Sequence, residues 1–231
     1  MEIRPVAYIH TDFPTKFGLP RQSGLVEGLK GEIVFEPYYR NPEGVKGLDG
    51  FSHLWLLWDF SLAHREDWSA TAKPPRLGGR THMGVWATRS PFRPNSIGLS
   101  SVRLDRIEMT ADRGPVLHVS GIDMMDGTPI YDIKPYISLY DSHPDARNGF
   151  VSETPFQELI VTDPDELIKK SALTAEQQEA LYEVLRADPR PRYDADNDGK
   201  RRYGFYYCDY DVRFYVRGNM LEVAELVPQA H

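Results

Sequence analysis

The sequence contains a single cysteine, Cys208, among its 231 residues. An internal disulfide and a cysteine-rich zinc site are therefore excluded, and the composition fits a reducing cytosol. Long hydrophobic runs are also missing: the longest, within HLWLLWDF (53–60), falls far short of the roughly 20 residues that cross a bilayer. The first residues show no basic segment followed by a long apolar stretch, which a signal peptide requires. These absences predict a cytoplasmic protein with no membrane-spanning segment.

The signatures of several enzyme classes are absent as well. No G-x-G-x-x-G follows a strand and no G-x-x-x-x-G-K-S/T occurs, which argues against a Rossmann crevice and a P-loop. No G-x-S-x-G elbow is present, which disfavours a nucleophilic hydrolase. We predict no metal site, because the histidines of the strand-rich half form neither an i, i+4 helical pair nor a compact group with carboxylates. These histidines are His10, His53, His64, His82 and His118.

His53 and Cys208 both have ordinary structural interpretations. His53 lies inside an aromatic strand, where we expect a hydrogen-bonded core histidine. Cys208 lies among tyrosines, where we expect a buried small residue rather than a reactive thiol.

Positive charge is in short supply. The chain has 27 Lys and Arg against 34 Asp and Glu, for a net charge of −7. Non-specific nucleic-acid binding depends on Lys and Arg laid against phosphates, so a wholly basic binding face is disfavoured and a local basic patch is not. Hydrophobic residues make up 41% of the chain and aromatic residues 12%, which is enough for a real core.

What the sequence does have, over residues 1–145, is a series of short apolar segments between turns. Several of them alternate apolar and polar residues, the period of a half-buried strand. We therefore predict a mainly β protein whose N-terminal domain is an antiparallel barrel or sandwich. In 99–110 the alternation slips once, as a β-bulge would cause. The predicted strands are 6–11, 30–38, 53–60, 82–89, 99–110, 115–124 and 129–137.

A polar, turn-rich linker (140–155) precedes a second pattern, which predicts a small α+β domain over 156–231. The spacing predicts a helix over 163–170, with Asp163 as its N-cap. It predicts another over 174–189, with Thr174 and Gln177 as a capping box. Residues 203–227 predict two strands joined at an Arg-Gly-Asn turn.

Four polar insertions combine Pro or Gly stiffness with Arg, Lys, Asp or Gln: 20–24, 87–100, 124–136 and 188–193. Any one of them alone is adequately explained as a stiff turn. Four together favour a preorganised polar site on loops over a rigid scaffold. Arginine forks bind carboxylates and phosphates, at about 1.5–3 kcal/mol for each shielded charged hydrogen bond.

These insertions and their flanks resemble one family. The segments PRQSGL, GLDGFSHLWLLWDF, PPRLGG, GVWATRSPFRPNSIGLSSV, DMMDGTPIYDIKPY, DPRPRY and DVRFYV together resemble TrmO, also called TsaA-like or YaeB-like, proteins. That family consists of S-adenosylmethionine (SAM)-dependent tRNA adenine-N6 methyltransferases built on a β-barrel. The resemblance spans nearly the whole chain. Ser23 and Ser96 stand where the family pattern usually has proline.

The resemblance implies methylation of threonylcarbamoyl-adenosine, at position 37 beside the anticodon of threonine tRNA, by a homodimer. It implies SAM as the cofactor. Adenine requires an apolar slot, which Phe60 and Leu99 could line; Arg89 could hold the carboxylate of SAM, and Asp126 could accept from a hydroxyl or amine. The SAM-binding residues implied are Gln22, Ser23, Gly24, Phe60, Ser61, Arg89, Leu99, Asp126, Gly127, Thr128 and Pro129.

The acceptor nitrogen of that substrate is urea-like, so a proton acceptor should help the transfer. In DPRPRY, Asp188 could take the proton and Tyr193 could stack on the base, by analogy with the D-P-P-Y loops of other adenine N6-methyltransferases. Asp132 and Lys134 could equally be involved. DPRP could instead simply end the preceding helix.

RNA contact is predicted for two regions. Phe92 and Arg93 extend from the 87–100 corner, and the densest basic stretch lies near tyrosines that could stack on unpaired bases. That stretch consists of Arg190, Arg192, Lys200, Arg201 and Arg202. A solvated helix end beside an aromatic core strand would give the same pattern. Two other functions remain open: a non-catalytic RNA-binding barrel, and a hydrolase or isomerase of a small anionic metabolite.

Overall fold

The structure is a computed structural model, which describes residues 2–78, 81–153, 158–190 and 199–229. Its chain divides into two compact units. The first consists of Met1–His10, Glu32–Val119 and Gly127–Phe156, and the second of Thr11–Gly31, Ser120–Asp126 and Gln157–His231. Each is described below by itself. The domain boundaries at 145 and 156 stay a prediction.

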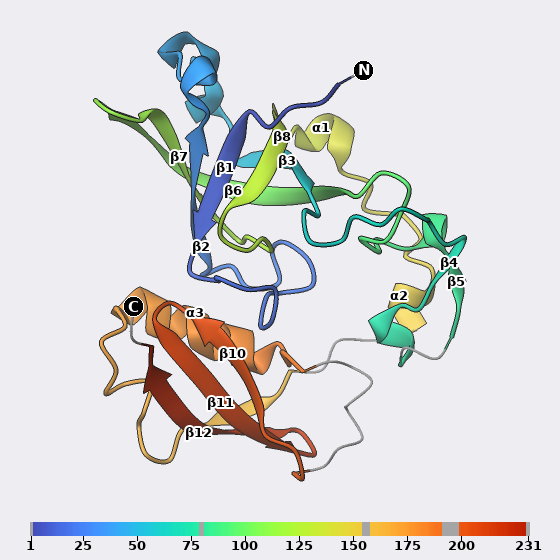
Figure 1. The fold of residues 1–231 in the computed structure, drawn as a ribbon, viewed down its shortest axis with the longest axis vertical. Coiled ribbons are helices and arrows are strands. Elements are labelled where there is room, and N and C mark those ends of the chain that lie inside the picture. Colours follow the sequence, from blue (N-terminus) through green and yellow to red (C-terminus); the bar gives the residue numbers. More distant parts are fainter. Residues whose placement is uncertain (1, 79–80, 154–157, 191–198, 230–231) are drawn as a thin grey trace. The chain divides into compact units, whose positions relative to one another are not determined.

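A six-stranded closed barrel forms the N-terminal architecture (Figure 1). The strand order is β1–β2–β7–β6–β3–β8, and β3 pairs antiparallel with both β6 and β8. The predicted mainly β fold with an antiparallel barrel is thereby confirmed. The strands are β1 (Ala7–Thr11), β2 (Lys30–Phe35), β3 (His53–Asp59), β6 (Ile97–Thr110), β7 (Gly114–Ser120) and β8 (Thr128–Pro135).

Alternation along β3 and β6 fills the barrel. Leu54, Leu56 and Trp58 are buried on β3. On β6, every second residue from Gly98 to Leu104 is buried, whereas the intervening Leu99 and Arg103 are exposed and Ser101 is half-buried. The indole Nε1 of Trp58 donates to Ser100 Oγ at 2.9 Å, which satisfies the polar atoms that this packing buries. Contrary to the interpretation above, His53 is exposed, because it starts β3 on the outward face and bonds Ser52.

The expected bulge in 99–110 has another explanation. Pairing of β6 with β3 runs in unbroken register from Ile97 to Arg103 and ends there. Beyond that point β6 continues toward the turn into β7 with mostly exposed side chains. The loss of alternation marks where β6 leaves its β3 partner.

A long excursion (60–96) joins β3 to β6. It contains a two-residue ladder of β4 (Thr71–Ala72) with β5 (Met83–Gly84), and 3₁₀ turns at Pro75–Leu77 and Val85–Ala87. The predicted strand over 82–89 is therefore wrong for all but two residues. Thr88 explains the break: its hydroxyl donates to the carbonyl of Val85 at 2.9 Å, so the chain curls instead of extending. Two short helices follow β8, α1 (Ser138–Asp141) and α2 (Phe150–Glu153).

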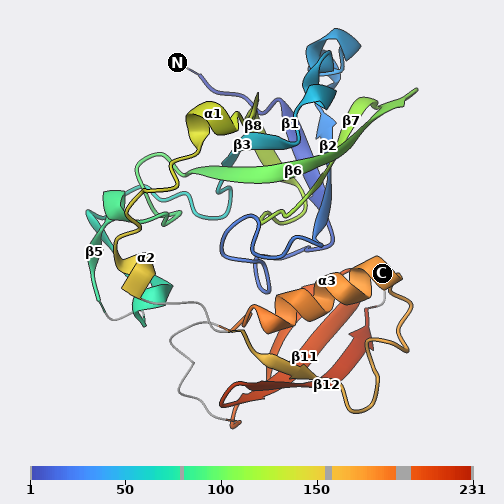
Figure 2. The same ribbon diagram turned by 180° about the vertical axis from the view of Figure 1, so that it is seen from behind.

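The second unit is a four-stranded sheet with one helix, which lies across one face of the sheet in both Figures 1 and 2. The strand order is β10–β11–β12–β9. The parallel pairing of β9 with β12 has no signal in the local sequence. The elements are β9 (Ile160–Thr162), α3 (Ala175–Arg186), β10 (Tyr203–Tyr207), β11 (Tyr210–Arg217) and β12 (Met220–Pro228).

Helix α3 confirms the predicted capping box. The Thr174 side chain accepts from the Gln177 backbone N–H, and the Gln177 side chain accepts from that of Thr174. Together they satisfy backbone donors that the first turn leaves without partners. The apolar stripe that packs inward consists of Ala180, Leu181, Val184 and Leu185.

Two predictions for this unit are wrong. Residues 163–170 form turns instead of a helix, because Glu166 adopts a left-handed φ of 54°. Asp163 does cap this segment: its carboxylate oxygens accept from Leu167 N and Ile168 N at 2.8 and 2.9 Å. The first strand predicted in 203–227 is in fact two, since Cys208, at a φ of 48°, lies in the tight turn between β10 and β11.

The segment Thr11–Gly31 belongs to the second unit by its contacts. The buried Phe13 ring packs against Phe205 at 6.3 Å and Tyr207 at 5.2 Å between ring centroids. Gly18 lies so close to Phe205 that a Cβ would stand 2.4 Å from its ring. Burial, aided by the charge of nearby Asp12, raises the pKa of the Cys208 thiol, which keeps it protonated and inert.

Gly98 allows a test of barrel packing. A Cβ at this position would lie 2.2 Å from the Trp58 indole, so Gly98→Ala should destabilise the protein by about 1–3 kcal/mol through overpacking. Urea unfolding measures this change. Gly44→Ala is the matched control, since nothing lies within 4 Å of its Cβ position. Equal stability of both variants would contradict this view of the core.

Candidate functional site

The corner at 87–96 is built from consecutive short-range hydrogen bonds. Thr88 Oγ1 accepts from Ser90 N, and Ser90 Oγ accepts from Phe92 N, both at 3.3 Å. Arg93 Nη1 donates to the Thr88 carbonyl at 3.1 Å. These bonds hold the corner in one conformation, with Arg89 exposed. The stiffness predicted from its prolines therefore has a hydrogen-bonded counterpart.

The strand ends of the barrel carry further predicted SAM residues. Phe60 N donates to the carbonyl of Ser96 at 2.9 Å, and the Phe60 ring packs on Trp58 at 4.2 Å between centroids. Ser61 is exposed. Leu99 is also exposed and pairs with Leu57, so it faces outward, whereas Trp58 faces inward. The slot predicted from Phe60 and Leu99 therefore stays a prediction.

Gly127 precedes β8, and Thr128 and Pro129 begin it. Gly127 has a φ of 72°, and its N–H donates to the Ile9 carbonyl at 2.9 Å. Thr128 is buried and pairs with Ile9, while Pro129 pairs with Tyr8. Nothing lies within 4 Å of a Cβ built on Gly127, so its backbone is open to close approach.

The remaining predicted SAM residues lie in the second unit. Gly24 has a φ of 76°, nothing within 4 Å of its Cβ position, and an N–H donated to the Gly121 carbonyl at 2.9 Å. Gln22 and Ser23, which precede it, are half-buried. Asp126 is exposed, and its Oδ1 accepts from Thr11 N at 3.1 Å. These bonds fix the backbone at Gly24 and the position of the Asp126 carboxylate, as a ligand-binding loop requires.

Asp188 is held in a strained, paired conformation. Its φ is 50°, and Arg190 makes two bonds to its carboxylate, Nε to Oδ1 at 2.8 Å and Nη2 to Oδ2 at 3.0 Å. The Arg190 side chain is only 6% exposed, and its backbone carbonyl accepts from Arg21 at 2.8 Å. Burial leaves Arg190 little surface for RNA. Tyr193 and Arg192 lie outside the described residues.

Asp132 and Lys134 form a second acid–base pair, on β8. Lys134 Nζ lies 2.8 Å from Asp132 Oδ2, and the side chains are 62% and 46% exposed, respectively. Asp132 pairs with Leu57 and therefore faces outward, like Leu99. The two residues are consequently more accessible than the Asp188–Arg190 pair.

Sequence reasoning missed a polar group at the end of β3. Asp59 Oδ1 lies 2.7 Å from His64 Nε2. Burial, together with the charge of Asp59 and its hydrogen bond, raises the pKa of Tyr131. Tyr131 lies where the register of β3 with β8 shifts, and local sequence carries no signal for that shift.

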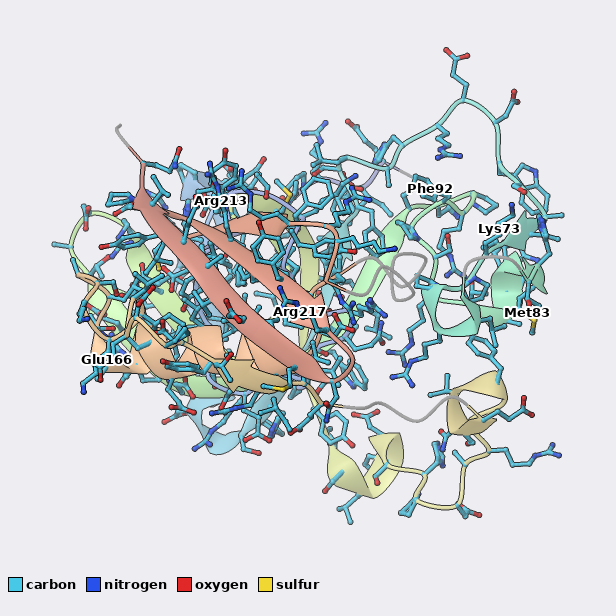
Figure 3. All side chains as sticks on the ribbon, turned by 90° about the horizontal axis from the view of Figure 1, so that it is seen from below. Lys73, Met83, Phe92, Glu166, Arg213 and Arg217 are labelled. Atoms are coloured by element: carbon cyan, nitrogen blue, oxygen red, sulfur yellow. The ribbon has the colours of Figure 1, made fainter. Side chains whose placement is uncertain are left out.

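The basic stretch of the second unit is exposed over Lys200, Arg201 and Arg202. Arg201 lies 5.5 Å from the centroid of the Tyr203 ring, a cation–π distance, and Arg202 pairs with Glu225 at 2.8 Å. Tyr203 and Tyr207 are buried, whereas Tyr206 is exposed. Arg213 and Arg217 of the same sheet are labelled in Figure 3.

Within residues 2–78, 81–153, 158–190 and 199–229, no group of three or more His, Cys, Asp or Glu could hold a metal ion. Within the same ranges, no helix has the length and apolar character needed to span a membrane.

Two family models match the chain. That of the tRNA-methyltransferase O N-terminal domain covers residues 8–142, and that of the TrmO C-terminal domain covers residues 164–229. The chain belongs to the TrmO family. The resemblance deduced from its motifs is thereby confirmed.

Relatives match over nearly the whole chain. The tRNA (adenine(37)-N6)-methyltransferase of Escherichia coli is 38% identical over 233 residues, which cover 99% of this chain and 98% of the relative. A putative S-adenosylmethionine-dependent methyltransferase of Pseudomonas aeruginosa is 38% identical over 231 residues, or 97% of this chain and 96% of the relative. A crystal structure of TrmO from Pseudomonas aeruginosa, 32% identical, matches with a TM-score of 0.79 over 99% of this chain and 97% of that chain.

The Asp188 pair yields a prediction that separates two roles. Asp188→Ala leaves the Arg190 guanidinium buried without its partner, which should destabilise the protein by about 3 kcal/mol. Thermal and urea unfolding measure this loss. Asp132→Ala is the control, because its exposed pair should contribute less than about 1 kcal/mol. An Asp188→Ala protein of native stability would contradict a structural role.

Proposed function

We propose that this chain is a SAM-dependent tRNA (adenine(37)-N6)-methyltransferase, and that it methylates N6 of threonylcarbamoyl-adenosine in threonine tRNA. The observation that carries the proposal is the match of both family domains, with 38% identity to a protein named for this activity. The homodimer implied by the family resemblance belongs to the same proposal.

The described residues fit the chemistry of SAM. Gly24 and Gly127 each present open backbone at positive φ, as close contact with a ligand requires. Exposed Arg89, on a corner already stiffened by hydrogen bonds, suits a carboxylate. When bound, SAM supplies a methyl group activated by its sulfonium. The protein then contributes mainly position, because the displacement needs donor and acceptor in line.

The acceptor nitrogen must lose its proton. Asp188 has both oxygens engaged by a buried guanidinium, so drawing it out of this pair is costly. Asp132 is 46% exposed and its partner is an exposed lysine, an interaction of low cost to rearrange. These electrostatics favour Asp132 as the proton acceptor, with Lys134 setting its orientation and Asp188 holding Arg190.

The decisive experiment supplies SAM and threonylcarbamoylated tRNA, then measures the nucleosides by mass spectrometry. The expected result is a methyl gain on the modified adenosine alone. A non-catalytic RNA-binding barrel should give no heat on calorimetric titration with SAM. A hydrolase or isomerase of an anionic metabolite should leave all tRNA nucleosides unchanged.

Arg89→Ala tests the SAM part of the proposal. Loss of one shielded charged hydrogen bond, about 1.5–3 kcal/mol, should weaken SAM binding about 10- to 100-fold. Calorimetry gives the dissociation constants. Arg103→Ala is the matched control, since Arg103 is an exposed barrel arginine paired on the surface with Asp105. Equal SAM affinity of the two variants would remove Arg89 from the site.

Charge reversal tests the basic stretch. Lys200→Glu with Arg201→Glu should weaken tRNA binding and make it less salt-dependent, because fewer counterions are released, while SAM affinity stays unchanged. Lys169→Glu with Lys170→Glu changes the charge equally on an exposed turn of the same unit. Filter binding across salt concentrations compares the two. The same tRNA affinity in both pairs would contradict the patch.

A further inference from the structure

Three exposed rings lie on the excursion between β3 and β6. Trp68, Trp86 and Phe92 are 54%, 68% and 39% exposed. Large apolar side chains gathered on a surface mark interaction sites more often than single ones do. Phe92 is labelled in Figure 3 with Lys73 and Met83 of the same excursion. Neither tryptophan belongs to the residues assigned to SAM or to catalysis above.

The backbone brings the two tryptophans together. Thr71 pairs with Gly84 and Ala72 with Met83, and Val85 N donates to the Ala70 carbonyl at 2.9 Å. This ladder sets Trp68 beside Trp86, with ring centroids 5.9 Å apart and planes inclined by 32°. Backbone pairing therefore fixes the two rings next to each other on one surface.

Arginines extend this surface. The guanidinium carbon of Arg65 lies 3.7 Å from the Phe92 ring centroid, and that of Arg93 lies 5.6 Å from the Trp86 centroid. Both distances are in the cation–π range. Trp68 and Phe92 line a hollow of about 260 Å³, together with Arg65, Arg93, Glu66 and Asp67.

The local charge is opposite to that of the whole chain. Residues 61–100 contain six Lys or Arg and two Asp or Glu, whereas the chain carries a net charge of −7. An apolar surface of this kind would suit many partners, but the surplus of arginine narrows the choice to a polyanion with flat apolar parts. Unpaired RNA has this chemistry, with a π-face on each base and a phosphate beside it.

We propose that Trp68, Trp86, Phe92, Arg65 and Arg93, here called the aromatic platform, stack unpaired bases of the RNA substrate. The rings and guanidinium planes take the base faces, and the arginine charges take the phosphates. Glu66 and Asp67, which line the hollow, can accept from exocyclic amines of a base. The proposal rests on the proposed function only for the identity of the RNA.

The test measures binding without SAM, using two RNAs of equal length: an anticodon stem-loop and a fully paired duplex. Trp68→Ala and Trp86→Ala should each bind the stem-loop about 5- to 100-fold more weakly and the duplex almost unchanged, because only unpaired bases stack. Trp68→Phe and Trp86→Phe keep a ring and should restore most of the affinity. Melting curves check that each variant is folded.

Tyr38→Ala is the matched control. Tyr38 is 87% exposed and belongs to the same unit, but lies outside the aromatic platform. Its removal should leave stem-loop binding unchanged. Unaltered binding by both tryptophan variants, an equal loss on duplex RNA, or an equal loss in Tyr38→Ala would overturn the aromatic platform and favour a protein partner for these rings.

The outcome is separable from that of the proposed function, because this binding assay needs neither SAM nor methyl transfer. If the wild-type protein transfers no methyl group but Trp68→Ala weakens stem-loop binding, the methyltransferase proposal is refuted and the aromatic platform is retained. If the wild-type protein methylates tRNA but all variants bind the stem-loop equally, the methyltransferase proposal is retained and the aromatic platform is refuted.

Discussion

The packing of Trp58 inside the barrel anchors both ends of the excursion over residues 60–96. Its indole donates to Ser100, lies against Gly98 and packs at a tilt against Phe60, so one side chain connects the end of β3 to the start of β6. The hydrogen bond from Phe60 N to the Ser96 carbonyl joins the two ends of the excursion. Ordering a long loop costs conformational entropy, and fixing its two ends limits that cost to the excursion itself. Arg89, Phe92 and the aromatic platform are carried on this excursion.

Burial, rather than composition, decides which arginines of this chain are available to a ligand. A chain with net charge −7 concentrates arginine on the β3–β6 excursion, while its C-terminal unit buries Arg190 against Asp188 and pairs Arg202 with Glu225. Two arginines that look alike in a sequence thus serve different ends. Burying an ion pair costs desolvation energy that only a complete set of bonds offsets, so such an arginine stabilises structure and is withheld from a ligand. Arg89, exposed on a stiff corner, keeps the capacity to bind a ligand.

Local signals predicted the parts of the fold that depend on local physics. The Thr174–Gln177 box and the apolar stripe of α3 follow from hydrogen bonding and spacing within a few residues, and both are present. The predicted helix over 163–170 is wrong because Glu166 takes a left-handed conformation, which residue type alone does not dictate. The predicted strand over 82–89 is wrong because the Thr88 side chain competes for backbone bonds. Tyr131 and Trp68 were missed, since their neighbours come from distant segments.

The sequence by itself determined the family, the mainly β class and the chemical types available for SAM and RNA, because motifs and alternation are properties of neighbouring residues. Tertiary structure decided which of those side chains remain accessible: it buried Arg190, turned Leu99 outward and set Trp68 beside Trp86. Those outcomes depend on strand register and on long-range pairing. A shift of one residue in register moves a side chain to the opposite face of a sheet, and composition carries no record of that choice.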